Sequence, residues 1–455
     1  AYPRKERIKF TIQVKDDVTG TYVPKTAYLD MIQVRRIENP KGVWRSAGKS
    51  DNFHVTLMRL PYDNAEDFKP FNSEGAWRAT IIDGGDDFIT LRSTVEGSGS
   101  DNVQQTGVKS IEGAGEHPID FWIDFKGTIP EGATPRCAIV RVRYHNYTCE
   151  HDIFVRQGYA PITINGNAES NNNPAWTSYN VYRFDANNAP VYTKSPLEEG
   201  SLFRRGNRTA ILASNNDRSG FTFGVEPTGS FNVLEFGSAT TSQKTWSQLA
   251  PSTDDVTNRF KEWSIAGDHE RIATIEDFYT LESTSIHSNI NKAYGVLYGD
   301  GATETQKLVK EAFGYDHNED PTNSKKGMRG CFVFNVNNSR NIFFPIGKSG
   351  YGRRKGMTSN GEKVGALRYA QRTDYYNNDG TGNIQYVPLF YDLFERPGAI
   401  YQCRNRLSST GSDVKKSSAF DINYFTMGFE GFENGASNNS DGSDSDACFI
   451  RTVKY

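Results

Sequence analysis

An acidic loop near the C-terminus holds the best candidate metal ligands in the sequence. Asp441, Asp444 and Asp446 stand in the segment DGSDSD, where Gly and Ser fill the positions between them. Carboxylates spaced in this way can surround Ca²⁺, which prefers oxygen ligands. The loop lacks the full register of a calcium-binding loop and a bidentate Glu at the right distance, so a solvated turn is the alternative. Ca²⁺ is the one cofactor that the sequence suggests.

Two glycine-rich segments combine aromatic and polar side chains in the manner of a binding surface. In SGYGRR the glycines allow the backbone to approach a ligand closely. The loop YYNNDGTG sets two tyrosines beside adaptable polar groups. Aromatic faces next to planar hydrogen-bonding groups suit sugars, whereas core packing or an ordinary loop is the alternative. The candidate ligand-binding residues are Tyr351, Arg353, Arg354, Tyr375, Tyr376, Asp421, Asn423 and Tyr424.

Recognisable catalytic and zinc-binding motifs are missing from the sequence. The seven histidines form no HExxH or HxH pattern, and no GxSxG, P-loop or dinucleotide fingerprint occurs. His151 is predicted to be a hydrogen-bonded core residue. Cys331 and Cys448 stand inside strand patterns, where a small buried hydrophobe is the usual role. The chain is therefore predicted not to be an enzyme, although a pair of carboxylates could still lie close together in the fold.

The cysteine count of five gives no disulfide framework. Cys137 and Cys149 flank a hairpin that is predicted to turn at His145-Asn146. Strand alternation then places them on opposite faces of the sheet, with Cys149 facing Val142. Reduced thiols are expected at both positions.

Composition narrows the class of protein. The 455 residues are 36% hydrophobic and 13% aromatic with 42 Gly, which is typical of a β-rich surface protein. The net charge of −3 gives no field that would attract nucleic acid, and short basic clusters such as Arg204-Arg205 are expected to be solvated. No apolar run approaches the ~20 residues that would span a bilayer.

The first third of the chain alternates between apolar and polar residues with a period of two. Ile119, Phe121, Ile123 and Phe125 fall on one face of a predicted strand, with Asp120, Trp122 and Asp124 on the other. Further strands are predicted at 7–14, 29–36, 53–60, 76–82 and 87–93, and a hairpin over 138–155. Seven or so short antiparallel strands of this kind favour an immunoglobulin-like β-sandwich.

The rest of the chain mixes short strands with two predicted helices. An Asn-rich stretch at 160–176 is interpreted as a linker or as the first irregular segment of the next domain. Thr274 is predicted to cap a helix whose buried face carries Ile275, Phe278 and Leu281. A capping box at 303–306 predicts a second helix that ends at Gly314. This combination is typical of an α+β domain.

Four segments of the sequence resemble domains of bacterial surface proteins. The segments EGAWRATIIDGGDDFITL and DIFVRQGY resemble the BACON-type immunoglobulin module of the Bacteroidetes. The block RGCFVFNVNNSRNIFFPIGKSGYGRR and the last 37 residues resemble the Fibrobacter-type major paralogous domain, which closes on a strand like CFIRTV. That resemblance implies a C-type-lectin-like fold and an acidic residue, Asp446, paired with Arg451. The predicted division is a sandwich at 1–160, a linker at 161–184 and a lectin-like domain at 185–455.

The resemblance implies a surface lipoprotein or fimbrial tip that binds without catalysis. Expected partners are host or microbial glycans or proteins and pilin subunits, at the outer surface of the cell, with a lipid anchor on the unprocessed precursor. One alternative is an enzyme that acts on polysaccharide or a formylglycine-type oxidase, whose thiolates would come from Cys331, Cys403 and Cys448. A structural pilus subunit that assembles by strand addition is a further alternative.

Overall fold

The computed structural model describes most of the first half of the chain and separate segments of the second. It is mainly β, which confirms the coarse fold class. The described residues are 4–33, 37–59, 69–85, 87–94, 105–204, 207–212, 230–249, 265–267, 269–281, 289–300, 327–345, 371–376, 384–388, 399–406, 417–422, 427–432 and 447–455.

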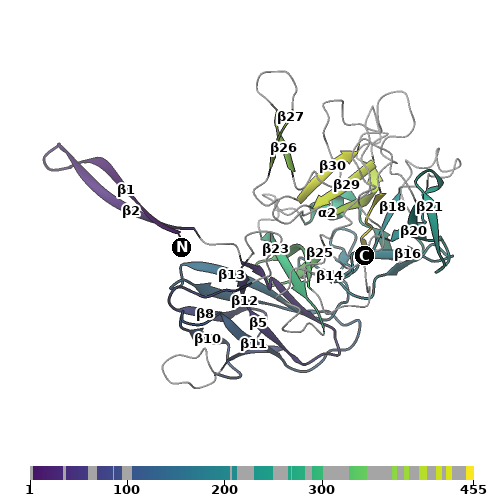
Figure 1. Cartoon of the computed structure of the whole chain (residues 1–455), viewed down its shortest axis with the longest axis horizontal. Coiled ribbons are helices and arrows are strands. Elements are labelled where there is room, and N and C mark those ends of the chain that lie inside the picture. The colour runs from purple at the N-terminus through teal and green to yellow at the C-terminus, as the bar shows by residue number, and fades with distance from the viewer. Residues whose placement is uncertain are drawn as a thin grey trace.

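Two facing sheets form the main body. Within the described part of the chain, the larger sheet has the order β10 (Ser110–Gly113), β8 (Trp77–Asp83), β12 (Arg136–Tyr144), β13 (Cys149–Gln157), β4 (Gly42–Arg45), β23 (Ile290–Tyr298), β24 (Met328–Asn335) and β25 (Asn341–Pro345). The smaller one has the order β5 (Asn52–Thr56), β11 (Asp120–Phe125) and β9 (Ile89–Ser93). Figure 1 shows them at the base of the molecule.

A core of alternating side chains fills the space between the two sheets. Phe121 and Ile123 of β11 and Val140 of β12 are fully buried there. The polar face of β11 carries Trp122, whose ring stacks on that of His54 with the centroids 4.4 Å apart. The predicted alternation at 119–125 and 138–144 is therefore confirmed, and so is the predicted role of His151, which is buried with its Nε2 2.7 Å from the Pro40 carbonyl oxygen.

The larger sheet crosses the predicted boundary between the two halves of the chain. Strand β4 pairs in parallel with β13 on one side and with β23 on the other. The predicted purely antiparallel arrangement is thus wrong at this point, because alternation of side chains does not distinguish parallel from antiparallel neighbours. Val296 and Tyr298 of β23 join the core between the sheets. The division of the chain into domains stays a prediction, but strands from the second half complete the sheet of the first.

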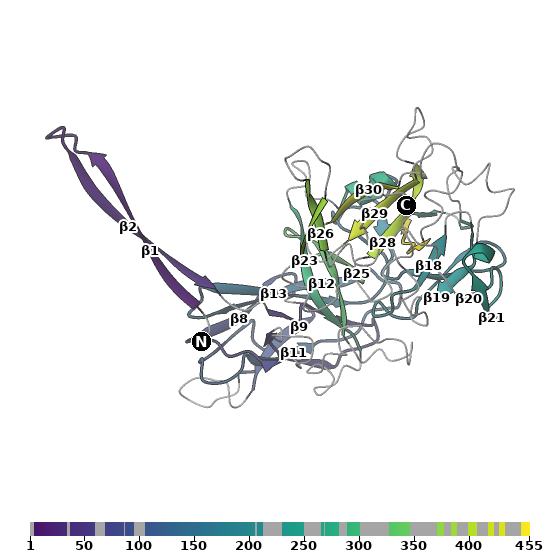
Figure 2. The same ribbon diagram turned by 45° about the horizontal axis from the view of Figure 1, so that its top comes forward.

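The opposite face of the larger sheet is buried as well. Trp44 and Phe154 pack there with Phe332 and Phe343, and Leu197 covers them from the following segment. The later strands pack on the other face of β24 and β25, where Tyr401 and Phe449 join Cys331 and Phe344 in a further core; Figure 2 shows these strands above the large sheet. The large sheet is therefore the middle layer of the molecule, with a core on each side.

The second half contains several smaller sheets and short elements. They are β14 (Ile162–Thr163), β15 (Ala175–Trp176), β32 (Thr452–Lys454) and β22 (Glu270–Ile272) in one sheet, and β21 (Thr241–Thr245), β20 (Ser230–Leu234), β19 (Ala210–Leu212), β18 (Ser201–Arg204) and β31 (Ala447–Cys448) in another. The others in this part are β16 (Val181–Phe184) with β17 (Pro190–Tyr192), β26 (Gln371–Tyr376) with β27 (Ile384–Pro388), and β28 (Ala399–Arg406) with β29 (Ser417–Ile422) and β30 (Met427–Phe432). Near the start of the chain, β3 (Ile37–Asn39) forms a further small sheet with β6 (Met58–Arg59) and β7 (Lys69–Pro70). A 3₁₀ turn spans Ser247–Leu249.

The predicted linker is part of a sheet. Strands β14 and β15 lie at 162–176 and pair with each other. Strand β15 also pairs with the C-terminal strand β32, where Trp176 lies opposite Val453. Ile162, Ile164 and Trp176 are buried. These contacts favour the second interpretation of the stretch 160–176, as the first irregular segment of the next folded part.

The predicted helix near 275 is present. Helix α2 (Ile275–Tyr279) begins after Thr274, whose hydroxyl accepts a hydrogen bond from the Asp277 N–H at 3.1 Å. The Asp277 carboxylate accepts a hydrogen bond from the Thr274 N–H at 2.9 Å and forms an ion pair with Arg271 at 2.7 Å. Ile275, Phe278 and Leu281 are buried as predicted. The second predicted helix, at 303–314, lies outside the described residues.

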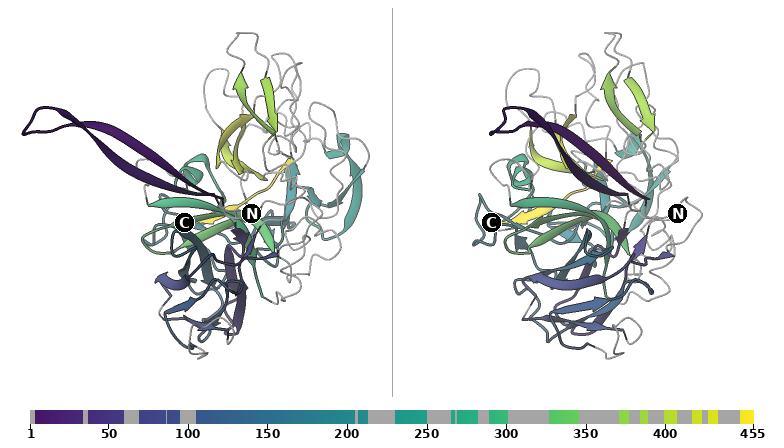
Figure 3. Two further views of the ribbon diagram at one scale, coloured as in Figure 1. Left: turned by 60° about the vertical axis from the view of Figure 1, so that its left-hand side comes forward. Right: turned by 90° about the vertical axis from the view of Figure 1, so that its left-hand side faces the viewer.

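The first two strands leave the body of the molecule. Strands β1 (Arg4–Lys15) and β2 (Tyr22–Gln33) pair only with each other within the described part of the chain. They form a long ribbon that projects from the body in Figure 1 and in the left view of Figure 3. Strands were predicted near these positions but as members of the sandwich, and that placement is wrong. A period of two identifies a strand and its faces but not the sheet that it joins.

None of the five cysteines, all of which lie in the part of the chain that the structure describes, takes part in a disulfide. Cys137 and Cys149 lie on opposite faces of the large sheet, as predicted, but Cys149 pairs with Tyr144 and not with Val142. The turn spans four residues, 145–148, which shifts the register from the predicted one. Cys331, Cys403 and Cys448 are buried, the position expected of small core hydrophobes.

Candidate binding site at one end of the sandwich

A cavity of about 790 Å³ opens at one end of the sandwich, where three loops meet. One loop leads into β8, one follows β10, and the third is the turn between β12 and β13. The residues that line it are Asn72, Ser73, Glu74, Gly75, Ala76, Gln105, Glu112, Gly113, Ala114, Gly115, Glu116, His145 and Tyr147. Loops at the end of a rigid sandwich are a common place for recognition.

The turn between β12 and β13 has an unusual backbone. His145, Asn146 and Tyr147 have φ angles of 52°, 55° and 66°, so three consecutive residues adopt the left-handed conformation. Asn and His are among the residues that adopt this conformation more readily, but Tyr rarely does so unless its surroundings hold it in place. Residues in such a conformation concentrate at functional sites, which makes this turn a candidate for function.

Hydrogen bonds to the neighbouring loop hold the turn. The His145 N–H donates to the Ser73 hydroxyl at 2.8 Å, and the Glu74 N–H donates to His145 Nδ1 at 2.8 Å. Asn146 and Ala76 exchange two further bonds of 3.0 Å, one from each N–H. Because Nδ1 accepts, a neutral His145 ring carries its proton on Nε2. The two loops therefore form one rigid unit.

Glycines allow the loops to approach one another. At Gly75, which has a φ of 84°, a Cβ atom would lie 2.2 Å from the Asn146 side-chain oxygen. At Gly115 a Cβ atom would lie 2.4 Å from the Ser73 carbonyl oxygen. Larger residues at these positions would push the loops apart, so the shape of the cavity depends on them.

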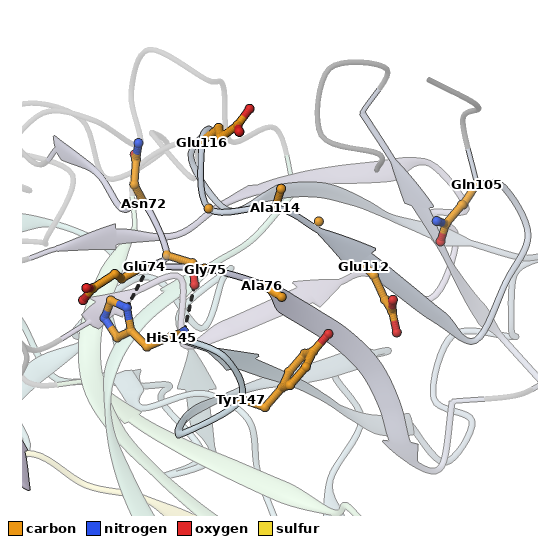
Figure 4. A pocket seen from close by; sticks show the side chains of 13 residues that line it. Asn72, Glu74, Gly75, Ala76, Gln105, Glu112, Ala114, Glu116, His145 and Tyr147 are labelled. Carbon is orange, nitrogen blue, oxygen red and sulfur yellow. Dashed lines mark hydrogen bonds between the residues drawn. The ribbon is translucent and has the colours of Figure 1, made fainter. Parts of the chain in front are cut away.

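The polar and aromatic side chains at the cavity lie in two clusters, one at each end (Figure 4). At one end, Arg78 donates to the Glu112 carboxylate at 2.6 Å, and its guanidinium carbon lies 5.2 Å from the centroid of the Tyr147 ring. Tyr147 is 39% exposed, so its ring is open to solvent beside this carboxylate. At the other end lie Glu74 and His145, with Glu116 on the loop above them in the view of Figure 4.

This arrangement suits a ligand that donates hydrogen bonds and presents a flat apolar face. Carboxylates such as Glu112 accept strong hydrogen bonds from hydroxyl groups, and the Tyr147 ring can stack on a carbon face. Gln105 and Asn72 add groups that both donate and accept. No group of three or more His, Cys, Asp or Glu side chains that could hold a metal ion occurs among the residues that the structure describes.

Three of the residues predicted from sequence to bind a ligand lie in described strands away from this cavity. Tyr375 and Tyr376 end strand β26, and Asp421 lies on β29 of a different sheet. The other predicted ligand-binding and metal-binding positions lie outside the described residues: Tyr351, Arg353, Arg354, Asn423, Tyr424, Asp441, Asp444 and Asp446. The site at the end of the sandwich was missed, although Glu112 and Glu116 alternate with glycine and alanine in the sequence EGAGE, a signal that could have indicated it.

One prediction about arginine is wrong, and another stays a prediction. The pairing of Arg451 with Asp446 is the one that stays a prediction, because Asp446 lies outside the described residues. Among the described residues, the Arg451 guanidinium donates to Asn180 Oδ1 at 2.8 Å, to the Thr177 carbonyl at 2.8 Å and to the Phe343 carbonyl at 3.1 Å. Arg204 is buried and not solvated, because it donates to the Trp246 carbonyl at 2.7 Å and stacks on the Trp246 ring. A short basic cluster does not reveal which of its members faces inward.

The comparisons with known proteins add no relative, since neither the protein-family models nor the curated proteins contain a match to this chain. None of the described helices has the length and apolar content that a bilayer crossing requires.

Glu198 supplies a pH-dependent contribution to stability. Burial raises its pKa to about 7, and the Lys194 N–H and charge offset this only in part. Since the pKa in the folded chain lies above the ordinary 4.5, folding favours the protonated acid. The resulting stabilisation is complete below pH 4.5 and is lost as the pH rises through about 7.

The variant Glu198→Gln should remove this dependence, because Gln is neutral at every pH. Urea unfolding between pH 4 and 8 should show the wild type losing stability relative to the variant across this window. The exposed Glu131→Gln is the matched control and should keep the wild-type slope. Parallel profiles for the wild type and Glu198→Gln would contradict the assignment.

Proposed function

We propose that this chain is a non-catalytic binding protein that captures a glycan in the cavity at the end of the sandwich. The observation that carries the proposal is the strained turn that presents the Tyr147 ring beside the Glu112 carboxylate. Pre-organised loops reduce the entropy that is lost on binding, which favours recognition by a fixed surface.

The cellular setting belongs to the same proposal. The sequence resemblance supports a place at the outer surface of a bacterial cell, as an adhesin or fimbrial tip. We take the sandwich as immunoglobulin-like and the C-terminal half as lectin-like; the two facing sheets and the short sheets with α2 are compatible with this. Calcium enters as a proposal through Asp441, Asp444 and Asp446.

A glycan array probed with the whole chain tests the binding function, followed by titration of the strongest ligand. Tyr147→Ala should weaken binding about threefold to tenfold through the lost stacking. Glu112→Gln should weaken it about tenfold or more, because a hydrogen bond to a charged group becomes a neutral one.

Two control variants accompany this test. Tyr279→Ala removes an exposed tyrosine on α2, and Glu150→Gln removes an exposed carboxylate on β13 outside the cavity. Both should bind like the wild type. Equal binding by the Tyr147 and Glu112 variants would place the ligand elsewhere, and a glycan that is cleaved during incubation would contradict a non-catalytic role.

A further inference from the structure

The hairpin β1–β2 has one apolar face that is exposed to solvent along its whole length. Directly paired residues share a face, so the register places Ile8 with Leu29, Phe10 with Ala27 and Val14 with Val23 on one side. Ile12 on this face is 62% exposed. The opposite face carries mainly polar residues, among them Arg7, Lys9, Thr11 and Lys15.

An isolated ribbon of this kind needs a partner. A two-stranded hairpin is at best marginally stable in water, because one of its faces has nothing to pack against. Six large apolar side chains on the face are between 38% and 62% exposed: Ile8, Phe10, Ile12, Val14, Leu29 and Met31. Such a contiguous apolar surface on a protein marks an interaction site.

The exposed area of this face is large enough for a stable interface with the same face of a second copy. Side chains of this type have surfaces of about 200 Å², so the face presents on the order of 600 Å² of exposed surface. Two such faces packed together would bury about 1,200 Å², which is the lower end of specific, stable interfaces. A second hairpin would therefore cover the first with enough area for association.

The charges on the face are self-complementary. Each directly paired couple of residues across the two strands forms one rung of the hairpin. Of the described side chains on this face, the charged ones are Glu6, in the rung with Met31, and Lys25, in the rung with Ile12. These rungs are six residues or about 20 Å apart, with only apolar rungs between them. If two hairpins pack face to face in opposite directions, Glu6 of one copy falls at the Ile12–Lys25 rung of the other. Packing in the same direction would set like charges together.

The edge of the hairpin is less suited to pairing than its face. The Asp16 N–H donates to the Thr21 carbonyl at 2.8 Å, so bonded rungs alternate outward from this one. Pro24, opposite Gln13, then falls at a non-bonded rung with its nitrogen on the outer edge of β2. Proline and lysine on edge strands are the usual protection against edge-to-edge pairing.

We propose that β1–β2 is a homotypic contact surface, through which two copies of this chain pack their apolar ribbon faces in antiparallel orientation with Glu6 of each against Lys25 of the other. This proposal does not depend on the glycan site, because the hairpin and the cavity share no residue. A dimer formed in this way would present two cavities.

Sedimentation of the whole chain over a range of concentrations tests the proposal. The wild type should show a monomer–dimer equilibrium that Phe10→Ser weakens by at least about tenfold, as expected for an aromatic residue at the centre of an interface. Thr11→Ser, on the opposite face, is the matched control and should dimerise like the wild type. A wild type that stays monomeric at every concentration would overturn the proposal, even if it bound another protein or neutral lipid vesicles through this face.

Charge reversal tests the orientation. Glu6→Lys alone and Lys25→Glu alone should each weaken dimerisation about tenfold or more, because each places like charges together. The double variant Glu6→Lys/Lys25→Glu should restore the wild-type constant. Failure of this rescue would overturn the antiparallel arrangement. An unchanged thermal unfolding midpoint in all variants shows that the body of the chain remains folded.

Discussion

Replacing Arg451 by Met should lower the free energy of unfolding by about 3–5 kcal/mol. The guanidinium is fully buried and holds together parts of the chain that are far apart in sequence: Asn180, the Thr177 carbonyl and the Phe343 carbonyl. It also lies 4.8 Å from the centroid of the Phe344 ring. Without it, two carbonyl oxygens and an amide oxygen lose a donor, and each unsatisfied buried group costs about 1–3 kcal/mol.

The buried charge opposes part of this effect. Burial lowers the pKa of Arg451, which Tyr401 partly offsets, so removal of the cation also relieves an unfavourable desolvation. The loss of three buried hydrogen bonds costs more free energy than the relieved desolvation of one charge returns, so the net change should be destabilising. Arg451→Lys should also destabilise the chain, because a single ammonium cannot reach the positions of a planar fork.

Urea unfolding measures the change in both variants. Lys454→Met, an exposed side chain on the neighbouring strand β32, is the control and should lie within about 0.5 kcal/mol of the wild type. If Arg451→Met proved as stable as this control, the hydrogen bonds of Arg451 would not be what joins the segments.

A fragment that ends at residue 160 should fail to fold cooperatively. It would contain β4 and β13 but lack β23, which pairs with β4, and Val296 and Tyr298, which fill the core between the sheets. On the other face, Trp44, Ile139 and Phe154 would lose Leu197, Phe332 and Phe343. Exposure of three large side chains costs about 1.5–3 kcal/mol each. The sum reaches the whole stability of a typical domain.

Near-ultraviolet circular dichroism and urea unfolding of the fragment check this expectation. The full chain should show a sharp transition, whereas the fragment should show a broad one or none. A fragment 1–160 with a sharp transition and native-like spectrum would confirm the sequence-based division and show that β23–β25 only add to an already stable sheet.

Local pattern was enough to predict much of the fold. The alternation at Ile119, Phe121 and Ile123 identified a strand and its buried face, since one side of that strand meets a core. Thr274 identified the start of α2, because an N-cap side chain contacts the backbone of the first turn that follows it. In each case the determining contact lies within a few residues of sequence.

Contacts between distant segments were not predictable in this way. The pairing of Val43 with Tyr298 joins strands more than 250 residues apart. The sequence of neither strand indicates which strand it pairs with. The first hairpin shows the same limit, because Ile8 and Phe10 alternate like core residues although the structure leaves them in water. Alternation of apolar residues predicts a strand with one apolar face, but it does not show whether the same chain or another molecule buries that face.

The candidate site was hidden for a related reason. Its key residue, Tyr147, lies in a turn whose conformation is fixed by Ser73 and Ala76 from an earlier loop. The sequence predicted a turn at His145-Asn146 but not three consecutive left-handed residues, which only these contacts sustain. Glu112 and Glu116 line a cavity only because the same loops meet in the fold.

The interleaved large sheet has a consequence for synthesis of the chain. Strand β4 leaves the ribosome early, but its neighbour β23 follows only after about 250 further residues, which at 5–20 residues per second takes roughly 10–50 s. During that interval one side of β4 has no partner, and exposed strand edges are prone to aggregate. Productive maturation of this protein should therefore rely on a holdase chaperone that shields the nascent sheet until its last strands arrive.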